Sequence, residues 1–285
     1  MEMPMPPLTT TIHDLRTAVL PWRAAGESVA FVPTMGALHR GHLTLVAEAK
    51  KIAKRVVVSV FVNPMQFAPH EDLATYPRQL EQDRALLAEA GADLLYAPTP
   101  EEMYPAGCAA AIDPGPMATL LEGVYRPTHF RGVATVVVKL LLQLLPDVAL
   151  FGEKDYQQLQ IIKQVVRDLD IAVHIMGVPI VRDADGLALS SRNAYLSPDE
   201  RSRALALPQA LTKAAAAIAG GGDIEQALTA ARAALTASGF AVDYVELAHA
   251  VTLQPLRTLN APARLLAAAK IGKTRLIDNV GVVLT

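Results

Sequence analysis

A short apolar run that leads through a glycine-rich turn into a helix is the feature of this sequence that most restricts its fold. Residues 29–32 have the β-branched and aromatic character of a buried strand, and residues 43–49 carry the apolar spacing of a helix. Gly36 and Gly41 stand in the turn between them, where they let the backbone bend sharply and approach a ligand closely. A strand, a tight turn and a helix in this order are typical of α/β proteins.

Two histidines, His39 and His42, flank Gly41 in the pattern His-x-Gly-His at the start of this helix. A helix N-terminus carries unpaired N–H groups and a partial positive charge, so it attracts phosphate. The pattern therefore indicates a nucleotide phosphate site that has no Walker lysine. Two other interpretations stay open, since the histidines are also compatible with half of a metal site or with a helix cap. Zinc would need further ligands, and the single cysteine, Cys108, has no obvious partner nearby.

Composition limits the class of protein. With 285 residues, 52% hydrophobic and 19% charged, the chain can bury a large core and is not of the disordered class. A net charge of −2 gives no sign of nucleic-acid binding. One cysteine suits a reducing compartment, residues 1–11 lack the pattern of a signal peptide, and residues 133–150 are too interrupted to span a membrane. We therefore expect a cytoplasmic protein with no membrane or nucleic-acid partner.

Strand and helix patterns alternate over the first two thirds of the chain. This alternation predicts an α/β fold, with a Rossmann-like parallel sheet that has helices on both faces. Ligands bind such sheets at the carboxyl ends of the strands, so the loops after Val32, Val62 and Phe151 should converge. The predicted strands are 29–32, 55–62, 94–96, 148–151 and 173–181, and the predicted helices are 77–90, 133–145 and 156–169.

The pattern changes near residue 181. Residues 198–219 and 223–238 read as helices, with Asp223 as the N-cap of the second. Strand-like segments follow at 242–247, 265–271 and 275–277, which together indicate a smaller α+β domain. The predicted domains are therefore 1–180 and 181–285.

Three further segments carry polar side chains suited to a site. Gln66 follows a strand and offers an amide donor and acceptor, which suits a hydroxy acid, although a hydrogen-bonded loop amide is the more common explanation for a single glutamine. Lys154 stands between a strand and a helix, where it can offset phosphate charge. Asp155 and Gln158 have the spacing of a capping box. Ser190–Arg192 offers two hydroxyls and a guanidinium to a triphosphate.

Two apparent motifs are rejected. Asp185-Gly186 reads as a tight hairpin turn, because the following positions lack the oxygen ligand and the glycine of a calcium loop. Residues 272–274 (GKT) do not form a Walker A motif, because Ala267 stands where that motif needs glycine and a strand pattern follows.

Several separate motifs, taken together, resemble the pantothenate synthetase (pantoate–β-alanine ligase) family over nearly the whole chain. They occur in that family's order and spacing: MGALHRGH (35–42), FVNPMQF (61–67), EDLATYPR (71–78), EMYP (102–105), GVATVVVKL (132–140), FGEKDYQQL (151–159), DGLALSSRNAYLS (185–197) and RLIDN (275–279).

The resemblance implies a nucleotidyltransferase-type domain that binds ATP and pantoate, a smaller C-terminal lid domain, and a homodimer. It also implies an AMP-forming carbon–nitrogen ligase of pantothenate biosynthesis, which makes pantothenate from (R)-pantoate and β-alanine through a pantoyl adenylate. ATP would be a substrate, and AMP and pyrophosphate would be products. Mg²⁺ would accompany the reaction.

The resemblance also implies roles for individual residues. Asp83 is matched to a position that helps to hold Mg²⁺, although it also fits an exposed helix residue. His39, His42, Lys154, Ser190, Ser191 and Arg192 would be catalytic, and Gln66 and Gln158 would bind pantoate or β-alanine. ATP would contact Met35, Gly36, Ala37, Leu38, His39, Arg40, Gly41, His42, Gly152, Glu153, Lys154, Asp155, Val181, Leu189, Ser190, Ser191 and Arg192.

The loop at 126–131 departs from the family pattern, because Thr128 and Arg131 stand where the family usually has Gly and Asp. Two rival functions remain. One is another His-x-Gly-His nucleotidyltransferase that couples ATP to a phosphate ester, against which the two glutamines argue. The other is a non-catalytic nucleotide-binding module, against which the intact His39, His42, Lys154 and Arg192 argue.

Overall fold

The computed structural model describes residues 4–69, 71 and 73–283, and the chain within it forms two compact units. The first unit runs to Ala118 and also includes Arg126–Glu153 and Ile161–Pro179. The second contains Thr119–Tyr125, Lys154–Gln160 and the chain from Ile180 onward. Two short segments that lie before residue 180 in the sequence are therefore part of the second unit.

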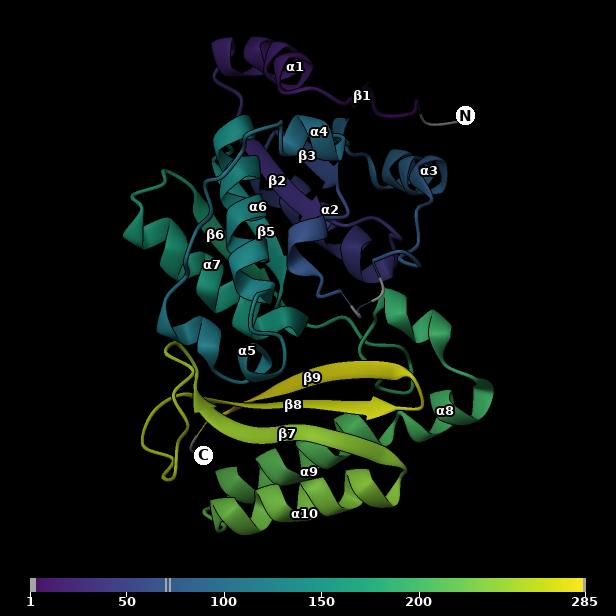
Figure 1. Ribbon diagram of the computed structural model, residues 1–285, viewed down its shortest axis with the longest axis vertical. Coiled ribbons are helices and arrows are strands. Elements are labelled where there is room, and N and C mark those ends of the chain that lie inside the picture. The colour runs from purple at the N-terminus through teal and green to yellow at the C-terminus, as the bar shows by residue number, and fades with distance from the viewer. Residues whose placement is uncertain (1–3, 70, 72, 284–285) are drawn as a thin grey trace. The chain divides into compact units, whose positions relative to one another are not determined.

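The first unit is built on a parallel sheet of six strands, as the alternating pattern predicts. The strand order is β1-β4-β3-β2-β5-β6, and every neighbouring pair is parallel. Figure 1 shows α6 lying along this sheet. The strands are β1 (Leu8–Thr9), β2 (Val29–Thr34), β3 (Arg55–Val60), β4 (Leu94–Tyr96), β5 (Val148–Gly152) and β6 (His174–Val178).

Helices and short 3-10 turns connect these strands. They are α1 (Ile12–Ala24), α2 (Arg40–Ile52), η1 (Pro64–Gln66), α3 (Leu80–Ala90), α4 (Pro100–Met103), η2 (Pro116–Thr119), α5 (Glu122–Tyr125), α6 (His129–Leu144), η3 (Glu153–Asp155) and α7 (Tyr156–Asp168). Among the described residues, no helix is both long and apolar enough to cross a membrane.

The core of the first unit follows from the alternation of side chains along β2 and β3. Ala30 and Val32 of β2 pack with Val56 and Val58 of β3, and α2 covers them with an apolar face that includes Val46. Strands buried on both faces are apolar throughout, which explains the unbroken β-branched run of β3. Because β3, β2 and β5 are neighbours and parallel, their carboxyl ends meet at one edge, as the sequence predicts.

Two helix starts in the first unit differ from the sequence prediction: α6 begins at His129 instead of Val133, and α3 begins after Pro77. The sequence predicts a helix from Pro77 to Ala90, but α3 begins at Leu80. The first helical hydrogen bond runs from the Asp83 N–H to the Gln79 carbonyl, and this leaves Pro77 outside the helix. The helix ends at Gly91 in a left-handed conformation, as predicted.

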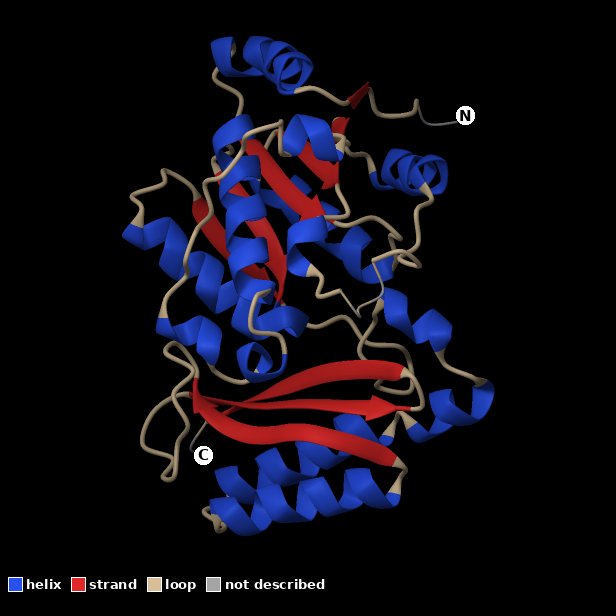
Figure 2. Ribbon diagram, in the orientation of Figure 1, coloured by secondary structure: helices blue, strands red, loops and turns tan. Residues whose placement is uncertain are grey.

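The second unit contains a three-stranded antiparallel sheet with two long helices packed against it (Figure 2). Its strands are β7 (Phe240–His249), β8 (Ala263–Ile271) and β9 (Thr274–Val282), and its helices and turn from residue 180 onward are η4 (Ser191–Tyr195), α8 (Pro198–Arg203), α9 (Ala206–Ala219) and α10 (Ile224–Ala237). Asp223 caps α10 through a hydrogen bond from the Gln226 N–H, as predicted.

The single helix expected over residues 198–219 is wrong, because the chain forms α8 and α9 with a break at Ala204 and Leu205. Pro208 explains the break. In a continuous helix its ring would clash with the carbonyl four residues earlier, which belongs to Ala204. The strand expected over 275–277 is also longer than predicted, since β9 pairs with β8 from Thr274 to Val282.

Candidate functional site

The turn between β2 and α2 carries the predicted phosphate-binding residues, and its backbone is unusual. Gly36 has φ +82° and the next residue, Ala37, has φ +52°, a region that side chains rarely adopt. A Cβ at Gly36 would lie 2.9 Å from both Asp83 Oδ2 and Val60 Cγ1, so this position needs glycine for space as well as for its φ. The Gly36 N–H donates to Thr34 Oγ1 at 3.1 Å.

His39 and His42 cap the helix that follows. The Gly41 N–H donates to His39 Nδ1 at 3.1 Å, and the His39 N–H donates to His42 Nδ1 at 3.3 Å. Because each Nδ1 accepts a hydrogen bond, the proton of each neutral ring lies on Nε2. The ring centroids are 4.1 Å apart. The helix-cap interpretation is therefore confirmed, and the caps fix both imidazoles in the tautomer that donates from Nε2.

Asp83 fixes the backbone of this turn through hydrogen bonds. Its side chain, on α3, is 1% exposed, so it is not an exposed helix residue. The Ala37 N–H donates to Asp83 Oδ2 at 3.0 Å and the Leu38 N–H donates to Oδ1 at 2.8 Å. Burial raises the pKa of Asp83, and these two donors act in the opposite direction. The carboxylate therefore anchors the strained part of the turn, including the left-handed Ala37.

No metal centre is assembled by the part of the chain that the structure describes. No group of three or more His, Cys, Asp or Glu side chains is arranged there to hold an ion. Asp83, which the sequence matched to a magnesium position, faces backbone N–H groups instead of other oxygen ligands. Magnesium takes oxygen ligands in an octahedron, so the surroundings of Asp83 do not fit a resident site.

Gln66 lies in η1 and contacts the turn between β2 and α2. Its Nε2 is 2.9 Å from the Sδ of Met35, so the structure brings these two predicted residues together. Its Oε1 accepts from Asn63 Nδ2 at 3.1 Å. The orientation of Asn63 is fixed in turn, because its Oδ1 accepts from the Met65 N–H and its Nδ2 donates to the Gly132 carbonyl. Gln66 therefore presents its N–H donors toward Met35.

The sequence does not identify Asn63 as the residue that orients Gln66, because an Asn-Pro pair after a strand reads as an ordinary turn. Its relevance lies in long-range contacts. Tyr104 donates to Asn63 Oδ1 at 2.8 Å, and Gly132 of α6 comes so close that a Cβ there would lie 2.3 Å from the Met65 carbonyl oxygen. No local sequence signal identifies either contact.

A second layer of polar contacts holds the backbone of Gln66. Arg126 donates to both oxygens of Glu71, at 2.6 and 2.7 Å, and also to the Gln66 carbonyl at 3.3 Å. His129 Nδ1 lies 3.0 Å from the same carbonyl. Thr128 has φ −98°, which any residue can adopt, so its departure from the family's glycine does not strain this loop. Arg131, the other departure, is exposed.

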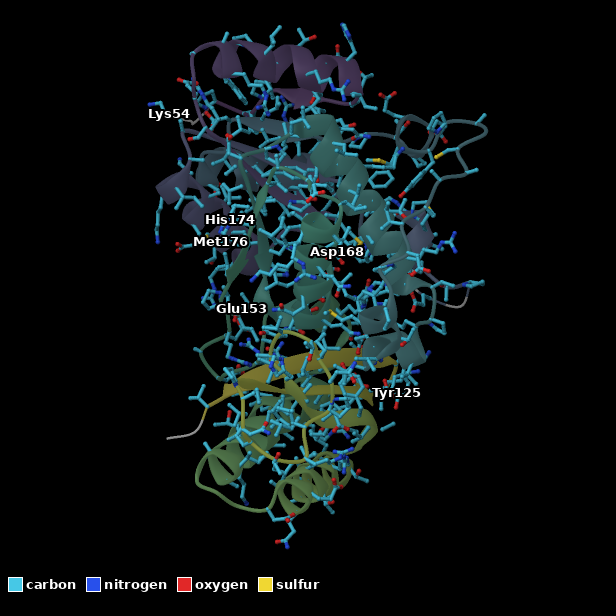
Figure 3. All side chains as sticks on the ribbon, turned by 90° about the vertical axis from the view of Figure 1, so that its left-hand side faces the viewer. Lys54, Tyr125, Glu153, Asp168, His174 and Met176 are labelled. Atoms are coloured by element: carbon cyan, nitrogen blue, oxygen red, sulfur yellow. The ribbon has the colours of Figure 1, made fainter. Side chains whose placement is uncertain are left out.

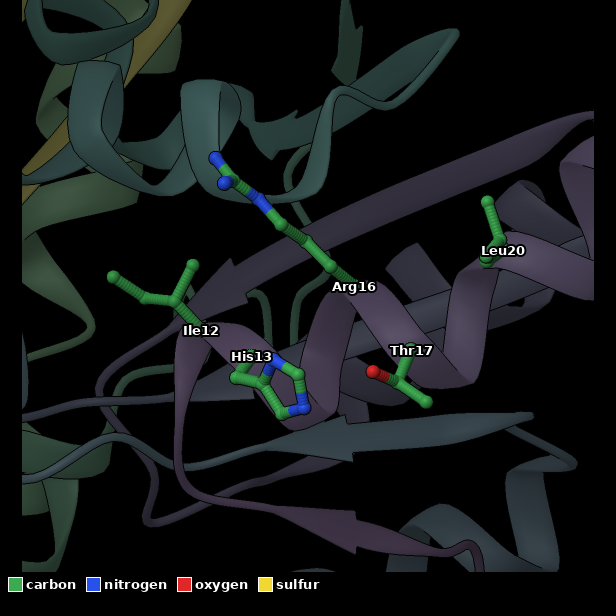
Figure 4. A pocket seen from close by; sticks show the side chains of 5 residues that line it. All are labelled: Ile12, His13, Arg16, Thr17 and Leu20. Atoms are coloured by element: carbon green, nitrogen blue, oxygen red, sulfur yellow. The ribbon is translucent and has the colours of Figure 1, made fainter.

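Gly152 and Glu153 complete the predicted site residues of the first unit. Gly152 ends β5, which pairs with β2, and Glu153 opens the turn η3 at the same edge of the sheet. Figure 3 labels His174 and Met176 along the neighbouring strand β6, and Glu153 beyond the end of β5. By contrast, a hollow of about 350 Å³ along α1 contains none of the predicted site residues (Figure 4); it is lined by Ile12, His13, Arg16, Thr17 and Leu20.

The remaining predicted residues lie in the second unit. They are Lys154, Asp155, Gln158, Val181, Leu189, Ser190, Ser191 and Arg192. Residues 181–189 form a small hairpin, in which the Leu189 N–H donates to the Val181 carbonyl at 3.0 Å and Gly186 takes the turn with φ +96°, as predicted. Ser190 caps η4 by accepting from the Arg192 N–H at 3.3 Å. Ser190, Ser191 and Arg192 therefore follow directly after the end of this hairpin.

We predict that Asp83→Asn disturbs the turn between β2 and α2. In the variant, the NH2 group of asparagine faces one of the two backbone N–H donors, so one hydrogen bond is lost. The free energy of unfolding should therefore fall by about 1–3 kcal/mol. ATP affinity should fall, while the Mg²⁺ concentration needed for half-maximal ATP binding should stay unchanged. Denaturant titration and calorimetry with ATP at several Mg²⁺ concentrations measure these quantities.

The matched control is Glu81→Gln, which makes the same chemical change at an exposed position of α3. It should leave stability within about 0.5 kcal/mol of the original. If Asp83→Asn behaved like this control, or if its defect disappeared at high Mg²⁺, the anchoring role would be wrong.

Comparison with known proteins identifies the family of this chain. The family model described as pantoate-beta-alanine ligase matches residues 7–281. A pantothenate synthetase of Rhizorhabdus wittichii is 56% identical over 96% of this chain and 98% of its own length. That of Caulobacter vibrioides is 54% identical over 98% of this chain and 100% of its own.

Solved structures give the same result. The pantothenate synthetase of Thermus thermophilus superposes with a TM-score of 0.92 and 50% identity, over 97% of this chain and 99% of that one. The pantoate-beta-alanine ligase of Francisella tularensis, solved in complex with beta-gamma ATP and beta-alanine, gives a TM-score of 0.81 and 36% identity, over 97% of each chain. By sequence and fold, this chain belongs to the pantoate–β-alanine ligase family.

Proposed function

We propose that this chain joins pantoate to β-alanine at the expense of ATP, through a pantoyl adenylate, and releases AMP and pyrophosphate. The observation that carries the proposal is the pairing of two features beside Met35. One is a helix N-terminus with two Nε2–H imidazole donors, and the other is the Gln66 amide with its N–H donors turned toward the same turn. The first suits a nucleotide phosphate and the second suits a carboxylate or hydroxyl oxygen.

The chemistry requires both features. A carboxylate is a poor acylating agent, so one of its oxygens must first bond to the α-phosphorus of ATP while pyrophosphate leaves. The barrier comes from bringing two anions together and from charge that builds on the phosphoryl oxygens. In the proposal His39, His42 and the α2 N-terminus offset this charge in the first unit, and Lys154, Ser190, Ser191 and Arg192 do so from the second.

Pantoate recognition is assigned to Gln66 and Gln158. Gln66 cannot turn its oxygen toward the substrate without losing the hydrogen bond from Asn63 Nδ2. The site therefore offers an N–H donor, and its partner on the substrate must be an acceptor. A phosphate-ester acceptor would favour lysine or arginine at these positions, which argues against the rival nucleotidyltransferase.

The second step needs the neutral amine of β-alanine. Its nitrogen attacks the carbonyl carbon of the adenylate, the bond to the AMP oxygen breaks, and the amine gives up a proton. Water would compete for the same carbon, so the adenylate must be kept dry until the amine arrives.

Further parts of the proposal concern magnesium, assembly and location. We place Mg²⁺ with the phosphates of ATP, as part of the substrate. We further propose a homodimer, a cytoplasmic location, and a division into an ATP- and pantoate-binding domain (1–180) and a lid domain (181–285). A single, exposed cysteine is also consistent with a reducing compartment.

Pyrophosphate exchange tests the proposed function directly. The protein should transfer labelled pyrophosphate into ATP when pantoate is present and β-alanine is absent, because adenylate formation is reversible. β-Alanine alone should not support exchange. Exchange that requires β-alanine would contradict the two-step scheme, exchange with phosphate esters but not pantoate would favour the rival enzyme, and no exchange with any acid would favour a non-catalytic module.

We predict that His42→Ala slows pantoate-dependent exchange by about 10²-fold or more, the scale for losing one transition-state donor. Stability should fall by about 1 kcal/mol, because the variant also loses an acceptor at the start of α2. His174→Ala, at an exposed position where β6 begins, serves as the matched control and should exchange at the original rate. A folded His42→Ala protein with the original exchange rate would refute the assignment.

A further inference from the structure

The RLIDN segment (residues 275–279) belongs to the family pattern but has no part in the proposed function so far. It lies in β9, and its last two residues are polar side chains in a buried place: Asp278 and Asn279 are each 2% exposed. Buried polar groups cost free energy unless they are hydrogen-bonded, so the partners of these two residues indicate why they are there.

Asn279 links β8 to the backbone of Lys154. Arg264 Nε donates to Asn279 Oδ1 at 2.6 Å, and Asn279 Nδ2 donates to the Lys154 carbonyl at 3.0 Å. Arginine can only donate and a carbonyl can only accept, so the two partners fix the orientation of the amide. The Lys154 backbone is therefore held by a side chain that sits in a sheet, which is a rigid support.

Contacts on either side of this bond reinforce it. The Arg264 guanidinium lies 4.1 Å from the ring centroid of Tyr156, two residues after Lys154, and Tyr156 donates to the Ala250 carbonyl at 2.9 Å. The side chain of Lys154 is only 20% exposed, with Nζ 3.9 Å from Asp155 Oδ2. A small shift of the Lys154 backbone would therefore move a confined ammonium group.

The neighbouring Asp278 supports the other nucleotide segment of the second unit. Its two oxygens accept from Arg182 Nη1 and Nη2 at 2.7 and 2.8 Å. Arg182 follows Val181 at the base of the hairpin that ends in Ser190–Arg192. Two adjacent residues of one strand thus hold the two segments to which phosphate contacts are assigned.

We propose that Asn279 is a positioning residue for Lys154: it fixes the Lys154 backbone so that the ammonium group is aimed at the phosphates of ATP, while Asp278 sets the Ser190–Arg192 hairpin from the same strand. This proposal rests on the proposed function, because it takes Lys154 to act on ATP phosphates. It assigns to Asp278 and Asn279, the two buried polar residues of the RLIDN segment, a role in the adenylation step in addition to their place in the sheet.

The test compares Asn279→Asp with the original protein by pantoate-dependent pyrophosphate exchange. Aspartate keeps the acceptor for Arg264 and replaces the donor to the Lys154 carbonyl with an oxygen. The maximal exchange rate should fall by about 10-fold or more, the scale expected when a group that acts on the transition state is misplaced. The KM for pantoate should stay unchanged, since Lys154 does not bind pantoate in the proposal.

The decisive comparison uses Lys154→Ala alone and combined with Asn279→Asp. If Asn279 acts through Lys154, the double variant should be no slower than Lys154→Ala, because the effects of residues that act as a unit are not additive. Leu276→Ala is the matched control, since it removes a buried apolar side chain of the hydrophobic core from the same strand. It should lower the melting temperature while exchange at 25 °C keeps the original rate.

Each other result overturns the proposal. A rate for Asn279→Asp equal to the original, when Lys154→Ala is slow, would show that the carbonyl contact is irrelevant. Equal losses in both backgrounds would show that Asn279 acts by another route. If Asn279→Asp does not fold, Arg264→Lys replaces it, and the original rate in that protein would contradict the proposal. Failure of the original protein to exchange with pantoate would instead refute the proposed function.

Discussion

The carboxylate of Asp83 is the constraint on which the rest of the candidate site depends. It is almost fully buried, and both oxygens accept N–H groups from the turn that leads into α2. A buried carboxylate is costly in free energy unless such donors surround it, and Ala37 adopts a left-handed conformation that costs about 1–3 kcal/mol unless the surroundings impose it. Each feature is unfavourable alone, and each stabilises the other. The position of His39 and His42 follows, because both residues cap the helix that this turn begins.

Histidine and amide side chains can either donate or accept a hydrogen bond. In both units, a neighbouring group that can only donate or only accept fixes the orientation of such a side chain. Backbone N–H groups fix the tautomers of the two histidines, and the Met65 N–H and the Gly132 carbonyl fix Asn63, which fixes Gln66. In the second unit Arg264 and the Lys154 carbonyl fix Asn279. In this protein backbone groups and neighbouring side chains fix the orientation of each of these groups, and under the proposed function less rearrangement is needed when substrates bind.

Much of the fold was predictable because it rests on local patterns. The β-branched run of β3, the capping Asp223 and the turn at Gly186 all appear in the structure as expected. The errors came where a local helix breaker was overlooked or where the partners of a residue lie far away in the chain. Pro208 breaks a helix at Ala204. The polar residues Asp278 and Asn279 made β9 look shorter in the sequence than it is, because partners far away in the chain allow both side chains to be buried in the strand.

The candidate site divides in the same way. Motif residues such as His42 could be predicted as site candidates from the sequence, since His39 and His42 lie next to the predicted start of the helix. The supporting residues could not. Asn63 depends on contacts with Tyr104 and Gly132, and the role of Asp83 depends on the Ala37 and Leu38 N–H groups, more than 40 residues away. Neither the contacts of Asn63 nor those of Asp83 produce a periodic pattern or a fixed spacing in the sequence.

Transfer of oxygen-18 from pantoate tests the central claim most directly, because that claim is that a carboxylate oxygen bonds to the α-phosphorus of ATP. The protein would turn over pantoate labelled at both carboxylate oxygens with ATP and β-alanine, and mass spectrometry would locate the label. The account predicts one labelled oxygen in AMP and one in the amide carbonyl of pantothenate. Label in inorganic phosphate or pyrophosphate, or AMP with no label, would contradict it.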